Sequence, residues 1–295
     1  MRAYDFVTYD VFTNRRFAGN QLAVLLDAKG LSGEAMQAIT REFNLAESSF
    51  VLPPENPENT ARVRIFTPGY EMPFAGHPTV GTAIAIAKAR GLEGELRLEL
   101  NAGIFPVRAM LSGHGGAAEF QNPNLPRETG AAPAAAQLEN ALSLPPGSID
   151  TGALKPRRVG AGVDFVYART SLEHVRAAKV NSAAWELLGI DEVVGVYLYT
   201  EGGEAADASY HVRMFAPGAG IMEDPATGSA AAALPGHIWL SGKLADGPHD
   251  WVIEQGFEMG RPSRINVNID VRNNAVSAVR IGGEAVAVQE GRILI

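Results

Sequence analysis

The stretch PFAGHPTVGTAIAIAKARG covers residues 73–91 and decides the fold. From Pro78 onward almost every residue is small or apolar, and the first charged side chain is Lys88. Proline is common at the first position of a helix and glycine just past the last, so Pro78 and Gly91 predict its two ends. A helix that is apolar on nearly every side must be buried. We therefore expect a buried, central helix here.

The same pattern returns in the second half of the chain. HPTVGTA (77–83) aligns with DPATGSA (224–230), and the preceding VRIFTPG (63–69) aligns with VRMFAPG (212–218). The spacings are nearly equal, 147 residues for the first pair and 149 for the second, and such regular similarity indicates repeated structural units. The matches predict an internal duplication, with two similar lobes that each contain a strand, a loop and a buried helix.

Outside the duplicated motif, strands alternate with few helices. Apolar runs and alternation predict strands at 4–12, 22–28, 46–52, 61–68, 95–103 and 105–111. Residues 32–43 predict an amphipathic helix with Ser32 as its N-cap. The Pro- and Ala-rich stretch 122–137 predicts the crossover between lobes. Pro235 and Gly236 predict that the second buried helix kinks or stops early, because proline removes a helical N–H.

Composition excludes several classes of protein. The chain has 295 residues, a net charge of -8 and no cysteine. The acidic balance argues against non-specific nucleic-acid binding, and the missing thiols exclude cysteine nucleophiles and cysteine-based zinc sites. The six histidines are scattered and no H-E-x-x-H motif occurs, so no metal site is expected. Without an apolar run of about 18 residues or a signal peptide, we expect a soluble, cytoplasmic protein that binds no membrane.

In both copies a polar residue stands before the proline, so we expect His77 and Asp224 to be the N-caps of the two apolar helices. A helix N-terminus presents unpaired N–H groups and partial positive charge, which suit a carboxylate or a phosphate. Gly81 and Gly228, one turn into each helix, would permit the close approach of a backbone or ligand. A structural histidine and an ordinary aspartate cap are simpler alternatives. The duplication favours a site assembled from both halves, in a cleft between them.

Four stretches carry a resemblance: FAGNQLAV (17–24), NLAESSFV (44–51), RIFTPGYEMPFAGHPTVGTA (64–83) and DPATGSAA (224–231). Together they resemble the PhzF family, the phenazine-biosynthesis isomerase and its relatives with the diaminopimelate epimerase-like fold. The resemblance implies an α+β protein of two pseudo-symmetric lobes, each a curved, mostly antiparallel sheet around a buried central helix. The active site would lie in the cleft between the lobes, which we place at 1–118 with 280–295 and at 119–279.

The resemblance also implies roles for individual residues. Glu47, in N-L-x-E-S, would be the general acid/base, while His77 and Asp224 would line the substrate site. The expected substrate-binding residues are Gly76, Thr227, Gly228 and Ser229. The enzyme would need no cofactor, and it would act on a small carboxylate-bearing substrate as a homodimer.

Without the resemblance, Glu47 would read as a solvated charge between a helix and a strand. In a cleft with apolar walls, the pKa of its carboxyl would rise, so that it could accept and return a proton near neutrality. The position before it is Ala46 where the phenazine enzyme often has serine, which removes one expected substrate hydrogen bond.

The leading hypothesis is an isomerase that moves a proton within a small acid such as a cyclic amino acid. One alternative is an amino- or hydroxy-acid epimerase or racemase that works without thiols. The other is a small-acid-binding protein that has lost its chemistry.

Overall fold

A computed structural model describes residues 2–295, which divide into two units. The first unit runs to Gln121 and includes Gly282–Ile295, and the second is Asn122–Ile281. The expected boundaries, 118/119 and 279/280, lie a few residues from these. The long strand β17 (Ala275–Leu294) contributes to both units, because it changes from the second to the first at Gly282.

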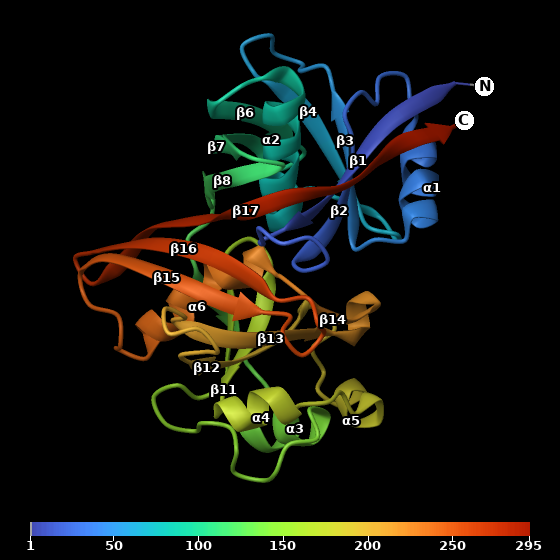
Figure 1. Ribbon diagram of the computed structural model, residues 1–295. Coiled ribbons are helices and arrows are strands. Elements are labelled where there is room, and N and C mark those ends of the chain that lie inside the picture. The colour runs from blue at the N-terminus through green and yellow to red at the C-terminus, as the bar shows by residue number, and fades with distance from the viewer. Residues whose placement is uncertain (1) are drawn as a thin grey trace. The chain divides into compact units, whose positions relative to one another are not determined.

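The first unit is a sheet around one central helix (Figure 1). The central helix is α2 (Gly76–Arg90). Apart from α2 and the end of β17, the unit contains β1 (Ala3–Val11), β2 (Asn20–Leu25), α1 (Gly33–Phe43), β3 (Glu47–Leu52), β4 (Ala61–Phe66), β5 (Glu71–Met72), β6 (Gly94–Leu100), β7 (Gly103–Ser112) and β8 (Gly115–Gln121). Most neighbouring strands are antiparallel, but β2–β3 and β4–β6 are parallel. Since β17 pairs with both β1 and β8, the strands close around α2.

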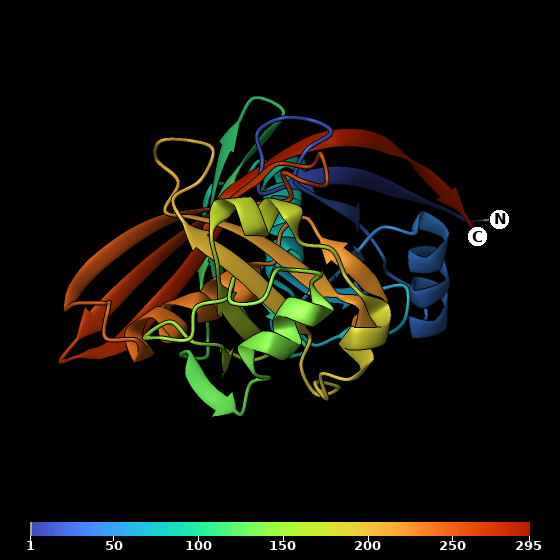
Figure 2. The ribbon, with the colours of Figure 1, turned by 90° about the horizontal axis from the view of Figure 1, so that it is seen from below.

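The two ends of the described chain meet in the first unit. Figures 1 and 2 show β1 beside the C-terminal part of β17. Their antiparallel register runs from Ala3 opposite Leu294 to Val11 opposite Ala285. Beyond the strands, the backbone N–H of Arg2 donates to the carbonyl of Ile295. The C-terminal segment is therefore an integral strand of this unit.

The second unit repeats the plan and adds short helices. Apart from the start of β17, it contains β9 (Arg127–Gly130), α3 (Ala135–Ala141), β10 (Arg157–Gly160), β11 (Asp164–Arg169), α4 (Leu172–Ala177), α5 (Ser182–Glu186), β12 (Gly195–Glu201), β13 (Tyr210–Ala216), η1 (Pro217–Ala219), β14 (Ile221–Asp224), α6 (Gly228–Leu240), β15 (Gly247–Gln255) and β16 (Ser263–Arg272). Here β11–β12 and β13–β15 are the parallel pairs. The central helix α6 contacts β9, β10, β11 and β16.

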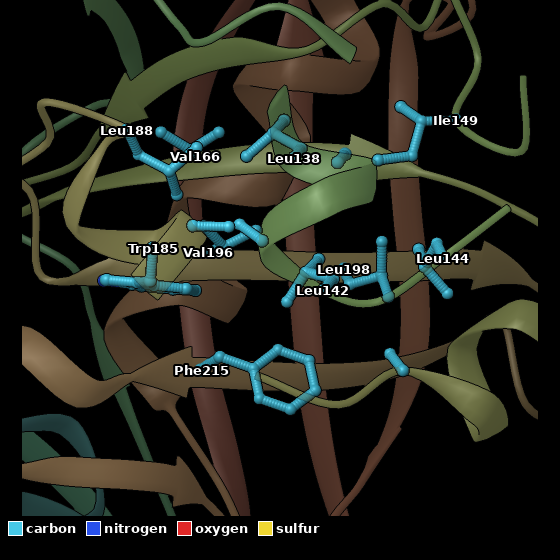
Figure 3. Close-up of a cluster of buried hydrophobic side chains, with 14 of the residues drawn as sticks. Leu138, Leu142, Leu144, Ile149, Val166, Trp185, Leu188, Val196, Leu198 and Phe215 are labelled. Atoms are coloured by element: carbon cyan, nitrogen blue, oxygen red, sulfur yellow. The ribbon is translucent and has the colours of Figure 1, made fainter. Parts of the chain in front are cut away.

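A hydrophobic cluster fixes the short helices to the sheet of the second unit. Figure 3 shows Leu138 of α3 and Leu142, its C-cap residue, facing Val196 and Leu198 of β12. Trp185 of α5 belongs to the same cluster. Burying such side chains contributes about 1.5–3 kcal/mol each, so this cluster gives the second unit a core of its own.

Paired side chains confirm the duplication in three dimensions. In the first unit, the guanidinium of Arg64 donates two hydrogen bonds to Glu71, at 2.7 and 2.6 Å. In the second, Arg213 donates to Glu223 in the same bidentate way, at 2.7 Å for each bond. Each arginine stands two residues before a phenylalanine and lies over its ring. Each glutamate lies on the short strand that precedes a central helix.

The predicted starts of the two central helices are wrong. Helix α2 begins at Gly76 with Ala75 as its N-cap, so His77 and Pro78 lie in the first turn. Proline fits there because the first N–H groups of a helix have no intrahelical acceptor. In the second unit the N-cap is Thr227, and Asp224 ends β14. The predicted early stop is also wrong, because α6 continues through Pro235 to Leu240.

Other local predictions are confirmed. The hydroxyl of Ser32 accepts a hydrogen bond from the N–H of Ala35 and caps α1. Gly91 ends α2 in the left-handed conformation, with φ of 63°. Gly81, however, differs from its prediction, since side chains and not a backbone or ligand approach it: a Cβ atom there would lie 2.7 Å from side-chain atoms of Leu22 and Val11.

Candidate active site

In the first unit, Glu47 and His77 form a close pair. Glu47 is the first residue of β3, opposite Leu22 of β2, and His77 lies in the first turn of α2. Glu47 Oε2 lies 3.3 Å from His77 Nε2, and only 12 % and 5 % of the two side chains are exposed. The sheet and its central helix thus place a carboxylate against a buried imidazole.

The surroundings of His77 determine its protonation. Burial lowers its pKa to about 3, against a smaller opposing effect of a hydrogen bond with the backbone of Gln21. The ring is therefore neutral near pH 7. Since Nε2 faces Glu47, the hydrogen bond with the Gln21 carbonyl belongs to Nδ1, and Nε2 carries the lone pair.

This arrangement suits a carboxyl group that gains and loses a proton. Once Glu47 is protonated, its hydroxyl can donate to the lone pair on Nε2 of His77. An ionised Glu47 has no hydrogen to donate, so it cannot form this hydrogen bond with Nε2 of His77. Only the protonated carboxyl can therefore donate a hydrogen bond to Nε2 of His77.

In the second unit, Asp224 belongs to a buried hydrogen-bond network. The hydroxyl of Thr227 donates to Asp224 Oδ2 at 2.5 Å. The side-chain amide of Gln255 donates to the backbone carbonyl of Asp224 at 2.7 Å and to the hydroxyl of Thr227 at 2.9 Å. Its carbonyl oxygen accepts from the N–H of Thr227 at 3.1 Å. These four bonds fix the loop before α6.

The remaining predicted residues lie at the starts of the central helices. Gly76 is the first residue of α2, while Gly228 and Ser229 are the first two of α6. N–H groups in a first helical turn have no acceptor within the helix and can bind a carboxylate. The structure brings Glu47 together with His77 in one unit. It brings Asp224 together with Thr227, next to Gly228, in the other.

Gln255 is the residue of this network that sequence reasoning missed. It ends β15 and is fully buried. The only signal in the sequence is a Glu-Gln pair after the apolar stretch WVI (251–253), since such polar residues are rarely buried without partners. That signal indicates a buried hydrogen bond but does not identify its partner.

The duplication contains only one copy of the glutamate. Strand β4 places Phe66 opposite Ser48, and β13 places its counterpart Phe215 opposite Val196. Ser48 and Val196 are therefore equivalent, and the residues before them, Glu47 and Gly195, correspond to each other. A Cβ atom on Gly195 would lie 2.2 Å from the backbone oxygen of Phe215, so no side chain fits there without a shift of the strands.

The described residues contain neither a candidate metal-ion site nor a membrane-spanning helix. Among residues 2–295, no group of three or more His, Cys, Asp or Glu side chains is arranged to hold a metal ion. Within the same range, no helix has both the length and the apolar character needed to cross a membrane.

Most of this chain matches one known protein family. The family model for phenazine biosynthesis-like proteins, PhzC-PhzF, matches residues 9–291. The chain belongs to the PhzF family. It is an isomerase, in agreement with the main functional prediction.

Individual members of the PhzF family match along their whole length. An uncharacterized isomerase of Mesorhizobium japonicum is 44% identical over 302 residues and covers 100% of both chains. The trans-2,3-dihydro-3-hydroxyanthranilate isomerase of Pseudomonas aeruginosa is 36% identical, over 97% of this chain and 98% of its own.

Solved structures confirm the predicted fold class. A PhzF-family protein of Bacillus anthracis has a TM-score of 0.89 at 30% identity, with 100% of each chain covered. A hydroxyproline epimerase of Agrobacterium vitis has a TM-score of 0.68 at 13% identity, over 99% of this chain and 92% of its own. The second likeness concerns the fold alone.

Proposed function

We propose that this PhzF-family isomerase moves a proton between two carbons of a small, carboxylate-bearing cyclic substrate, with Glu47 as the only general acid/base. The observation that carries the proposal is the pair formed by Glu47 and His77, together with the glycine at the duplicated position, Gly195. A single carboxyl group that takes a proton from one carbon can return the same proton to another.

The proposed reaction conserves its atoms and electrons. Ionised Glu47 removes a proton from a carbon of the substrate, and the electron pair of that C–H bond moves into a neighbouring conjugated system. Glu47 then protonates a second carbon of the same system, and its carboxylate is restored. Between the two steps, neutral His77 accepts the hydrogen bond of the protonated Glu47 and stabilises the intermediate state.

We further propose that the Asp224 loop serves the same substrate. Asp224 would accept a hydrogen bond from an amino or hydroxyl group. The first-turn N–H groups at Gly76, Gly228 and Ser229 would bind the carboxylate. The support is the equivalent position of the two loops before the central helices of the duplicated units, and the four hydrogen bonds that hold the Asp224 loop.

The test is proton exchange in D₂O, followed by NMR. The first compound is trans-2,3-dihydro-3-hydroxyanthranilate, the compound in the name of the Pseudomonas aeruginosa relative. Small cyclic and acyclic amino acids follow. Wild-type enzyme should rearrange at least one compound, while Glu47→Gln should bind it and leave it unchanged. Glu42→Gln, at an exposed position of α1, is the matched control and should keep full activity.

Each other outcome counts against the proposal. Equal activity in Glu47→Gln would exclude Glu47 as the acid/base. Deuterium at an inverted stereocentre would indicate an epimerase or racemase. Tight binding without rearrangement or exchange of any compound would indicate a binding protein.

The family resemblance also supports a homodimer, and the absence of cysteine fits a reducing compartment such as the cytoplasm. Light scattering during size-exclusion chromatography tests the first point, since a monomer has a mass of 31.3 kDa. A monomer at working concentration would contradict the proposed dimer.

A further inference from the structure

The position of Gln255 relative to Thr227 determines where one hydrogen atom lies. The amide nitrogen of Gln255 donates to Oγ1 of Thr227 at 2.9 Å. Because that bond occupies a lone pair of the hydroxyl, the hydroxyl hydrogen is directed to its other neighbour, Asp224 Oδ2, at 2.5 Å. Gln255 also holds the backbone on both sides of this contact, at the Asp224 carbonyl and the Thr227 N–H.

The end of β15, which carries Gln255, and the turn that follows it are held together by a buried histidine. His211 of β13 lies 3.1 Å from Glu254 through Nδ1 and 2.9 Å from Glu258 through Nε2. Burial opposes a charge on this ring, but the hydrogen bonds with Glu258 and Glu254 outweigh it and raise the pKa of His211. Through these two contacts the ring joins Glu254, the residue before Gln255, to the turn after it.

Close packing fixes the same turn against the loop of Asp224. Gly256, next to Gln255, has φ of 78°. A Cβ atom on it would lie 2.7 Å from the carbonyl oxygen of Pro225 and 3.1 Å from its Cα. Only glycine permits the two backbones to approach so closely.

We propose that Gln255 is a positioning residue of the active site, which acts through Thr227 to hold Asp224 in the orientation that the reaction needs. The inference rests on the proposed function of Asp224 as a substrate-binding residue. It adds to that function a chain of three donors and acceptors, from the Gln255 amide through the Thr227 hydroxyl to the Asp224 carboxylate. A displaced catalytic or binding group can reduce a rate by about 100-fold even when the displacement is near 1 Å.

Two variants separate the parts of this chain. Gln255→Leu removes all three hydrogen bonds of the side chain. Gln255→Glu keeps an acceptor for the Thr227 N–H but replaces the donor to the Thr227 hydroxyl with a second acceptor. Gln37→Leu is the matched control, because Gln37 of α1 donates to the backbone carbonyls of Thr67 and Pro68 in the other unit.

The first measurement does not depend on activity. Amide hydrogen exchange of full-length protein should accelerate at Thr227 by about tenfold or more in Gln255→Leu, the scale expected when one hydrogen bond is lost. In Gln255→Glu the Thr227 amide should keep its protection. Unchanged exchange at Thr227 in Gln255→Leu would overturn the proposal.

The second measurement uses whichever compound the wild-type enzyme rearranges. In both Gln255 variants kcat should fall by about 10- to 100-fold, with a smaller change in KM, while Gln37→Leu keeps the wild-type values. A Gln255→Glu enzyme with wild-type kcat would overturn the positioning role. If Thr227 responds as expected but no compound reacts with the wild type, the hydrogen-bond chain stands and the proposed function fails.

Discussion

Burial shifts the pKa of His77 and His237 alike, but the consequences differ. Burial lowers the pKa of each to about 3. His77 faces Glu47 and bonds the backbone of Gln21, so its neutral ring presents a lone pair to Glu47. His237 of α6 lies between the rings of Tyr167 and Tyr199, and neither ring nitrogen has a hydrogen-bond partner within residues 2–295. A buried imidazole without partners costs free energy in the folded state.

We predict that His237→Phe stabilises the protein in mild acid. Unfolded chains protonate histidine near pH 6.5, whereas folded His237 stays neutral down to about pH 3. The unfolded state therefore binds the extra proton between these values, and stability is lost as the pH falls. Removing this proton uptake should add about 2 kcal/mol to the free energy of unfolding at pH 5.

Urea denaturation at pH 5 and pH 8 measures this effect. The gain from His237→Phe should be larger at pH 5 than at pH 8, because the proton linkage acts only in acid. His114→Phe, in the exposed hairpin turn between β7 and β8, provides the control and should show no gain specific to acid. A gain of equal size at the two pH values would show that packing, and not proton uptake, is responsible.

At the scale of elements, the duplicated arginines of β4 and β13 offer a comparison within one molecule. Both pair with a glutamate on the next short strand, but Arg213 also donates to the backbone carbonyls of Val175, Arg176 and Ala178. Only 9 % of its side chain is exposed, against 24 % for Arg64. The second copy is thus more deeply embedded than the first.

We predict that Arg213→Met destabilises the protein more than Arg64→Met. Removing Arg213 leaves a largely buried glutamate and three carbonyls without their donor, which should cost about 3–5 kcal/mol. The more exposed Arg64 should cost about 1 kcal/mol. Equilibrium unfolding in urea compares the two variants directly. Equal losses in the free energy of unfolding of the two variants would contradict the prediction that the more buried arginine contributes more to stability.

The starts of the helices show where local patterns mislead. A proline predicts the first residue of a helix, yet Pro78 is preceded by Gly76 and His77 in the first turn of α2. In α6 the N–H of Thr227 donates to Gln255, 28 residues away, and this bond keeps the preceding loop out of the helix. The start of α6 cannot be found from neighbouring residues, since the competing hydrogen bond comes from β15.

At the scale of the whole molecule, the chain leaves the first unit at Gln121 and returns to it at Gly282. The second unit is one continuous segment. The first depends on the last strand, because β17 pairs with both β1 and β8.

We predict that a chain ending after Ile281 keeps a folded second unit and loses the first. Without the second part of β17, β1 and β8 become unpaired edges, and the sheet around α2 opens. Hydrogen exchange followed by mass spectrometry should show protection in 122–281 and rapid exchange in β1, β2 and β8. A chain ending after Leu294 is the control and should keep both units. Continued protection of β1 in the shorter chain would contradict the prediction.

The sequence by itself determined the duplication, the buried central helix and the Ser32 cap, and through the family motifs it predicted that Glu47 and His77 belong to the active site. These features depend on residue periodicity and short motifs, which are readable from neighbouring positions. The tertiary structure alone decided that His77 faces Glu47, that Gly195 takes the place of a second glutamate, and that Gln255 holds the Asp224 loop. Each of these depends on hydrogen bonds, strand register or burial between residues that are distant in the chain. The physical reason is that such contacts arise only when the sheets have closed around their helices.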